Sequence, residues 1–183
     1  MQDEQSVVRR AQQKDKDAFA ELYEAYFDKI YRYIVLKIGD RTEAEDMTQQ
    51  VFLKALKSLP DYKWKDVPFS AWLYRIAHNQ VVDHYRKSGR QQSCELTEEI
   101  TPDDPEGNPE HQTELKVDIQ SLVKATRQLT RAQQEVIALR FSSDLPVAEV
   151  ARLMGRSEGA VKALQHSAVV ALRKIMVVVE DYD

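Results

Sequence analysis

The sequence predicts an all-α protein built as two small helical domains joined by an acidic linker. Only 5 glycines and 6 prolines interrupt 183 residues, which favours long helices over turn-rich sheets. Apolar residues recur at helical spacing in both halves of the chain. Residues 91–110 lack that spacing and carry seven acidic side chains, no basic one and three prolines. We therefore expect domains at residues 1–90 and 112–183 and a linker at 91–111.

The composition excludes several classes of protein. The formal net charge is −4, and the single cysteine, Cys94, cannot form an internal disulfide, which suits a reducing cytoplasm. No apolar run approaches the roughly 20 residues of a membrane span, and the N-terminus is polar and acidic. We expect a cytoplasmic protein with no signal peptide and no membrane insertion. Cys94 and the four histidines fit no metal-ligand spacing, and no glycine-rich loop, catalytic triad order or paired-carboxylate motif occurs. We predict no metal, no cofactor and no enzymatic activity.

Three helices are expected in the N-terminal domain. A broad apolar face runs along residues 19–38 and ends at the Gly-Asp pair that follows. A Thr-Glu-Ala-Glu capping box at residues 42–45 opens a second helix with apolar side chains inward and polar ones outward. A loop at residues 60–68 bears two aromatic rings, and a third helix follows from residue 69 to residue 86. Three helices of this kind form a compact bundle.

A helix-turn-helix is expected in the C-terminal domain. A Thr-Arg-Ala-Gln capping box at residues 130–133 opens a helix that ends near Phe141. A short helix at residues 147–154 is followed by Gly155 and by Ser157, the expected N-cap of the last helix. A short helix, a tight turn and a longer capped helix make up a helix-turn-helix, whose second helix enters the major groove of DNA.

Four segments of the chain resemble bacterial sigma factors. Residues 44–55 (AEDMTQQVFLKA) resemble the region that binds core RNA polymerase. Residues 69–79 (FSAWLYRIAHN) resemble the helix that engages the −10 promoter element. Residues 129–136 and 157–166 resemble the domain that binds the −35 element. The short length, with two domains and a linker, is similar to the extracytoplasmic-function (ECF) group of the sigma-70 family.

The resemblance implies that the chain binds core RNA polymerase and promoter DNA and is not an enzyme. The second helix would dock on a coiled coil of the largest polymerase subunit. Such an interface needs a polar rim around a few apolar anchors. Gln50 stands where an acidic residue is more usual in the family. The residues expected at this contact are Asp46, Gln49, Gln50 and Phe52.

On the −10 side, melted DNA exposes bases and phosphates, so the protein should offer stacking rings and cations. Asn79 matches a family residue involved in −10 recognition, and its amide both donates and accepts hydrogen bonds. Trp72 is expected in the domain core instead. The residues expected to contact the −10 element are Tyr62, Trp64, Arg75, Asn79, Asp83, Arg86 and Lys87.

On the −35 side, the resemblance assigns the last helix to the major groove. Lys162 and His166 are expected to read bases, and two cations further along the helix to contact phosphates. The full set expected at the −35 element is Ser157, Glu158, Gly159, Lys162, Ala163, His166, Arg173 and Lys174. Ser167, Val169 and Val170 stand where many relatives carry cations, which predicts a shallower salt dependence.

Two interpretations of the C-terminal end remain open. Val170 and the valines at residues 177–179 form either a partner surface, for instance for an anti-sigma protein, or the last part of the domain core.

In the family, the segment between the domains threads the polymerase channel later used by nascent RNA. The negative charge of residues 91–111 suits such a channel.

The alternative function is a stand-alone helix-turn-helix transcriptional regulator that does not dock on core polymerase. That alternative requires a receiver or ligand-binding domain before the helix-turn-helix. The first 90 residues instead predict a helical bundle with no phosphate loop, acidic pocket or apolar cavity signature. Co-purification with core polymerase distinguishes the two functions.

Overall fold

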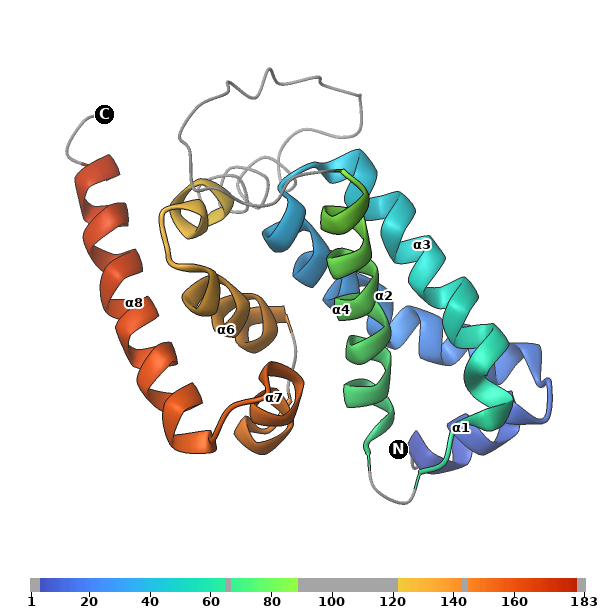
Figure 1. Ribbon diagram of the computed structural model, residues 1–183. Coiled ribbons are helices and arrows are strands. Elements are labelled where there is room, and N and C mark those ends of the chain that lie inside the picture. The colour runs from blue at the N-terminus through green and yellow to red at the C-terminus, as the bar shows by residue number, and fades with distance from the viewer. Residues whose placement is uncertain (1–3, 65–66, 89–121, 143–144, 181–183) are drawn as a thin grey trace.

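The computed structural model describes residues 4–64, 67–88, 122–142 and 145–180, with the backbone alone for 177–180. Every element in these residues is helical, which confirms the predicted all-α class (Figure 1). The N-terminal domain contains α1 (Glu4–Gln12), α2 (Lys16–Ile38), α3 (Arg41–Ser58), the 3-10 turn η1 (Leu59–Asp61) and α4 (Phe69–Lys87). The C-terminal domain contains a helical stretch at 122–127, α6 (Arg131–Ser142), α7 (Val147–Met154) and α8 (Glu158–Glu180). Within these ranges no helix is both long and apolar enough to cross a membrane. The predicted linker and Cys94 lie outside the described residues.

Helix α2 is the centre of the N-terminal domain, and α1, α3 and α4 all pack against it. Its residues Ile30, Tyr33 and Ile34 are fully buried. Helix α1 was not predicted, because its apolar residues are few and stand among charged ones. It buries Val7 and Val8 against the bundle, as a single short apolar stripe allows.

The caps at the ends of α2 and α3 differ in part from the prediction. Gly39 ends α2 as expected, in the left-handed conformation with a φ of 78°. Thr42 was predicted to cap α3, and this is wrong. Asp40 is the N-cap, since its carboxylate accepts a hydrogen bond of 2.8 Å from the backbone amide of Glu43. Thr42 therefore lies inside the first turn of α3.

The C-terminal domain has the predicted caps. The amide of Thr130 donates to the Gln133 side chain at 3.1 Å, and the amide of Gln133 donates to the Thr130 hydroxyl at 3.4 Å, as in a capping box. Gly155 makes the tight turn after α7 with a φ of 61°, and Ser157 accepts a bond of 3.2 Å from the amide of Ala160. The helix-turn-helix formed by α7 and α8 is present.

The two domains pack against each other, and the sequence did not indicate this contact. Helix α6 lies between α2 and α8, in contact with both (Figure 1). Among the described residues, two groups of polar contacts and one close approach join the domains. The carboxylate of Glu135 on α6 meets side chains of α2 and α4, the hydroxyl of Tyr74 donates to the carbonyl of Ser142 at 2.6 Å, and the guanidinium of Arg127 lies against Gly39.

We predict that the two left-handed glycines differ in their cost of substitution. Gly155→Ala should lower the free energy of unfolding by about 1 kcal/mol, the cost of a left-handed conformation for a residue with a Cβ, because nothing lies within 4 Å of that Cβ. Gly39→Ala should cost more, since its Cβ would lie 2.1 Å from the Arg127 guanidinium and displace it. Urea denaturation measures both values.

The double variant Gly39→Ala/Arg127→Ala removes the collision and serves as the control for Gly39. Gly159→Ala, at a helical position with open space around it, should not reduce stability. A smaller loss for Gly39→Ala than for Gly155→Ala would contradict this account of the interdomain contact.

Candidate polymerase and nucleic-acid interfaces

The outer face of α3 presents the expected polar residues but not the expected aromatic one. Asp46, Gln49 and Gln50 are exposed. Phe52 is only 4% exposed, with its ring centroid 4.7 Å from that of Tyr23. Phe52 therefore cannot be a surface contact in this structure. It continues the buried series Ala44, Met47, Thr48, Val51 and Ala55, so the helical period turns it inward.

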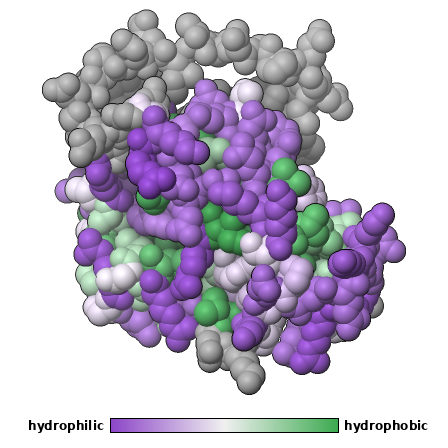
Figure 2. Space-filling model, turned by 45° about the vertical axis from the view of Figure 1, so that its right-hand side comes forward, coloured by the Kyte–Doolittle hydropathy of each residue, from purple (hydrophilic) through white to green (hydrophobic). Residues whose placement is uncertain are grey.

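The apolar side chains on the outer face of α3 are Leu53 and Leu56, 58% and 46% exposed. Leu53 lies seven residues after Asp46 and four after Gln49, so the same period places all three on one face. Sequence reasoning did not select Leu53, and it placed Leu56 on the inward face, which is wrong because that side chain is nearly half exposed. The spacing could have identified both. On the face that Figure 2 shows, the surface is largely hydrophilic, with smaller hydrophobic areas among polar side chains.

Gln50 also joins α3 to α4 through a chain of hydrogen bonds. The ammonium of Lys54 donates to the side-chain oxygen of Gln80 at 2.9 Å, and the Gln80 amide donates to the oxygen of Gln50 at 3.3 Å. Gln80 is buried, and the sequence analysis did not select it. The face of α3 is thereby held in register with α4, the helix expected to engage the −10 element.

The aromatic residues before α4 form a packed cluster rather than a row of free rings. Tyr62 is 8% exposed, its hydroxyl donates to the carbonyl of Val67 at 2.6 Å, and its ring centroid lies 4.9 Å from that of Trp72. Burial raises the pKa of the Tyr62 phenol. The expectation that Tyr62 offers a stacking surface is contradicted, because its ring fills the junction between the loop and α4. Trp64 is half-buried beside it, and Trp72 packs inward as expected.

From α1, the side-chain amide of Gln12 donates to the carbonyls of Leu59 and Tyr62, at 3.0 and 2.7 Å. These bonds hold the start of the loop in place. Helix α1 is therefore a support for the aromatic cluster that the sequence analysis did not recognise.

The solvent face of α4 carries most of the residues expected at the −10 element. Arg75, Asn79, Arg86 and Lys87 are exposed, and Asp83 is half-buried and paired with Arg86 at 3.2 Å. Arg75, Asn79 and Arg86 follow helical spacing, so they share one face. The structure brings this set together, with Val82, 49% exposed, among them.

The outer face of α8 is open to solvent between residues 158 and 176. All the residues selected on this helix are exposed, as is its N-cap: Ser157, Glu158, Gly159, Lys162, Ala163, His166, Arg173 and Lys174. Lys162 and His166 line a shallow hollow together with Gln165 and Val169, which were not selected. Ser167 accepts a hydrogen bond of 3.1 Å from the Gln133 side chain. Ser167, which stands where many relatives carry a cation, thus joins α8 to α6 through a hydrogen bond.

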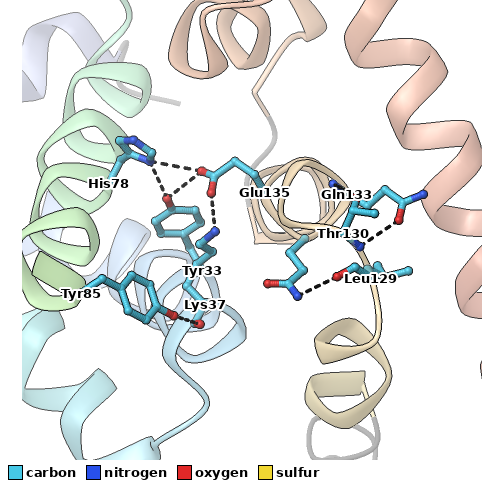
Figure 3. Close-up of polar contacts among 9 residues, drawn as sticks. Tyr33, Lys37, His78, Tyr85, Leu129, Thr130, Gln133 and Glu135 are labelled. Carbon is cyan, nitrogen blue, oxygen red and sulfur yellow. Dashed lines mark hydrogen bonds and ion pairs between the residues drawn. The ribbon is translucent and has the colours of Figure 1, made fainter. Parts of the chain in front are cut away.

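Glu135 is the most strongly perturbed carboxyl group among the described residues. One oxygen lies 2.5 Å from the Lys37 ammonium, and the other lies 3.0 Å from the Tyr33 hydroxyl and 3.2 Å from Nδ1 of His78 (Figure 3). Burial by itself raises the pKa of Glu135. The hydrogen bond from His78 and the charge of Lys37 outweigh this and bring the pKa to about 2.

Comparison with known proteins identifies the family of the chain. Residues 22–91 match the model of sigma-70 region 2, and residues 126–174 match the model of sigma-70 region 4. The chain is 39% identical over 170 residues to the ECF RNA polymerase sigma factor BldN of Streptomyces coelicolor, an alignment that covers 93% of this chain and 64% of BldN. It is 30% identical over 183 residues to the ECF sigma factor SigD of Mycobacterium tuberculosis, covering 97% of this chain and 85% of SigD.

Two solved structures share the fold. CnrH, in complex with the cytosolic domain of CnrY, superposes with a TM-score of 0.70 at 21% identity, covering 94% of this chain and 96% of that one. The sigma factor RpoE of Bartonella quintana, in complex with the anti-sigma factor NepR, gives 0.68 at 23% identity, covering 87% and 97%. The chain is therefore a sigma-70-type protein with regions 2 and 4. It belongs to the ECF group of RNA polymerase sigma factors, which are non-catalytic DNA-binding regulators that act with core polymerase at promoters.

We predict an acid dependence for the contribution of Glu135 to stability. Its pKa is lowered in the folded chain from an ordinary value of 4.5 to about 2, so its stabilisation is present above pH 4.5 and is lost as the pH falls through 2. The difference in unfolding free energy between the unsubstituted chain and Glu135→Gln should shrink over that range. Urea denaturation from pH 5 downward measures it, and the difference removes the effect of other carboxyl groups. A difference that stays constant from pH 4.5 to pH 2 would contradict the ion pairing.

Proposed function

We propose that the chain uses three separate helical faces to initiate transcription: α3 for core polymerase, α4 for the −10 element and α8 for the −35 element. The supporting observation is that each of these helices buries one face in its domain and leaves the face matching the family motif exposed. Run-off transcription with core polymerase over a randomised promoter library tests the whole proposal. Transcription that does not depend on the added chain would refute it.

Docking on polymerase is proposed to rest on Asp46 and Gln49 as the polar rim and on Leu53 and Leu56 as apolar anchors. A protein interface gains most of its affinity from a few desolvated anchors surrounded by polar contacts. Leucines that are about half exposed in the free chain can be desolvated by a partner without a change in the fold.

On the −10 side, Asn79 is proposed to read a base, while Arg75, Arg86 and Lys87 neutralise phosphates. Trp64 is the residue of the aromatic cluster proposed to stack on a base, because it is half-buried whereas Tyr62 is buried. On the −35 side, Lys162 and His166 are four residues apart on one face and can enter one major groove together.

The stand-alone regulator has no support, because the N-terminal half is a sigma region 2 rather than a receiver domain. Action together with core polymerase implies a cytoplasmic location, as the composition also suggests.

We propose an anti-sigma protein as a further partner. The exposed Val170 and Met176 on α8, 39% and 41% exposed, support a contact there. The side chains of residues 177–179 and the linker at 91–111 lie outside the described residues.

We predict that Leu53→Ala/Leu56→Ala weakens core-polymerase binding by about tenfold or more, because two interface anchors are lost. Asp46→Arg should also weaken binding, through the polar rim. Both variants should keep the stability of the unsubstituted chain, since the altered side chains face solvent. Fluorescence anisotropy of labelled chain titrated with core polymerase measures the affinity.

Phe52→Ala is the matched comparison on the same helix. It should lower the free energy of unfolding by about 3–5 kcal/mol, the usual cost of emptying a buried aromatic site. Unchanged polymerase affinity in a folded Leu53→Ala/Leu56→Ala variant would show that α3 does not carry the docking face.

We further predict that the two DNA-binding faces act on different promoter elements. Lys162→Ala or His166→Ala should weaken recognition of the −35 element by about 1–3 kcal/mol, the value of a lost base contact, and leave the −10 preference unchanged. Asn79→Ala should alter the −10 preference and open-complex formation alone. Selection of functional promoters from a randomised library with each variant measures both preferences. A shifted −10 preference in the Lys162 variant would overturn the assignment of faces to elements.

A further inference from the structure

The contact between the domains includes one largely buried carboxylate that none of the three functional faces uses. Glu135 projects from α6 toward the N-terminal domain, where it meets Lys37 from α2, His78 from α4 and the Tyr33 hydroxyl from α2 (Figure 3). We call these four residues the Glu135 cluster. The side chains of Glu135 and Lys37 are 14% and 12% exposed. Tyr33 is fully buried, and its hydroxyl also lies 3.1 Å from Nδ1 of His78.

The chemistry of the cluster makes this contact specific and sensitive to charge. A carboxylate with one oxygen on an ammonium and the other shared by a hydroxyl and an imidazole is fully satisfied while buried. When the domains part, all four polar groups can bond to water, so the Coulomb attraction gained in the contact is largely offset by the cost of desolvation. The contact also covers apolar side chains of α2, so opening exposes apolar surface as well, and the cluster contributes the part of the contact that depends on charge.

The closed arrangement is incompatible with the separation of the promoter elements. Their names place them about 25 base pairs apart, which is about 85 Å along B-form DNA. A domain of about 80 residues is about 30 Å across, so two domains in contact extend over about 60 Å. A segment of 21 residues, the length of the predicted linker, can span at most about 70 Å. The chain can therefore reach both elements once the domains separate, but not while α6 remains on α2.

We propose that the Glu135 cluster is an autoinhibitory latch: it holds the free chain closed, and engagement of both promoter elements requires that it break. The inhibitory effect on promoter binding rests on the proposed function, whereas the closed arrangement of the two domains does not. The functional faces of α3, α4 and α8 remain exposed in the closed chain, so the latch restricts their separation rather than their access. A binding-competent open form that is only fractionally populated lowers the apparent affinity by that fraction.

A charge exchange across the cluster tests the latch. Glu135→Lys places two cations together and Lys37→Glu places two carboxylates together, so each single variant should open the chain. The double variant Glu135→Lys/Lys37→Glu restores opposite charges and should close it again. Glu149→Gln is the matched control, because Glu149 is also a buried glutamate of the C-terminal domain, but its partner at 2.8 Å, Arg152, is on the same helix.

The first measurement is small-angle X-ray scattering of the full-length free chain. We expect the radius of gyration to rise by about a quarter or more in each single variant, with unchanged helicity by circular dichroism. The double variant and Glu149→Gln should give the value of the unsubstituted chain. Single variants that stay compact, or a double variant that stays expanded, would overturn the assignment of the latch to this ion pair.

The second measurement is run-off transcription with core polymerase at limiting concentrations of the chain, from a promoter that contains both elements. Each single variant should reach half-maximal transcription at a concentration lower by about 3- to 30-fold, and the double variant should not. An expanded chain with an unchanged half-maximal concentration would show that closure is not inhibitory and would overturn the latch. Absence of transcription with every variant and with the unsubstituted chain would instead refute the proposed function, while the scattering result would still decide the closure.

Discussion

The arrangement of the protein depends on the burial of the C-terminal third of α2. Four consecutive residues there, Tyr33 to Leu36, are each less than 10% exposed. A helix buried on successive residues must be covered on every side, since neighbouring side chains point about 100° apart. Helices α1, α3 and α4 cover part of α2, and α6 of the other domain covers the rest. Region 4 therefore packs against region 2 because α6 covers the apolar surface of α2 that the other helices leave open.

Local signals in the sequence predicted most of the fold. The Thr130–Gln133 capping box, the Ser157 cap and the two left-handed glycines each depend on residues within a few positions of one another, and all were predicted. The cap at Asp40 was misassigned because two overlapping capping signals lie within three residues, and only backbone geometry separates them. Helix α1 was missed because packing against α2, rather than its own pattern, stabilises it.

The candidate sites were predictable as helix faces but less so as individual side chains. Exposed polar residues on α3, α4 and α8 followed from helical periodicity and the family motifs. Phe52 and Tyr62 were assigned to surfaces because aromatic residues suit both a core and an interface, and sequence alone does not separate the two. The contact through Glu135 joins residues about 100 positions apart, so no local pattern could identify which residues pair there. The run Tyr33-Ile34-Val35-Leu36 was the available signal, because a helix that is apolar all round requires a further partner.

The position of α1 bears on where the folding unit of region 2 begins. The family match starts at residue 22, within α2, yet Gln12 bonds to two carbonyls of the segment that leads into the loop, and Val7 and Val8 close the bundle. A fragment cut at the edge of the family match would lose the first turns of α2 together with the Asp15 cap that starts it. It would also expose apolar surface that the intact chain covers. Region 2 of this protein is thus a larger folding unit than its motif, and exchange of this domain between sigma factors would have to include the twenty or so residues that precede it.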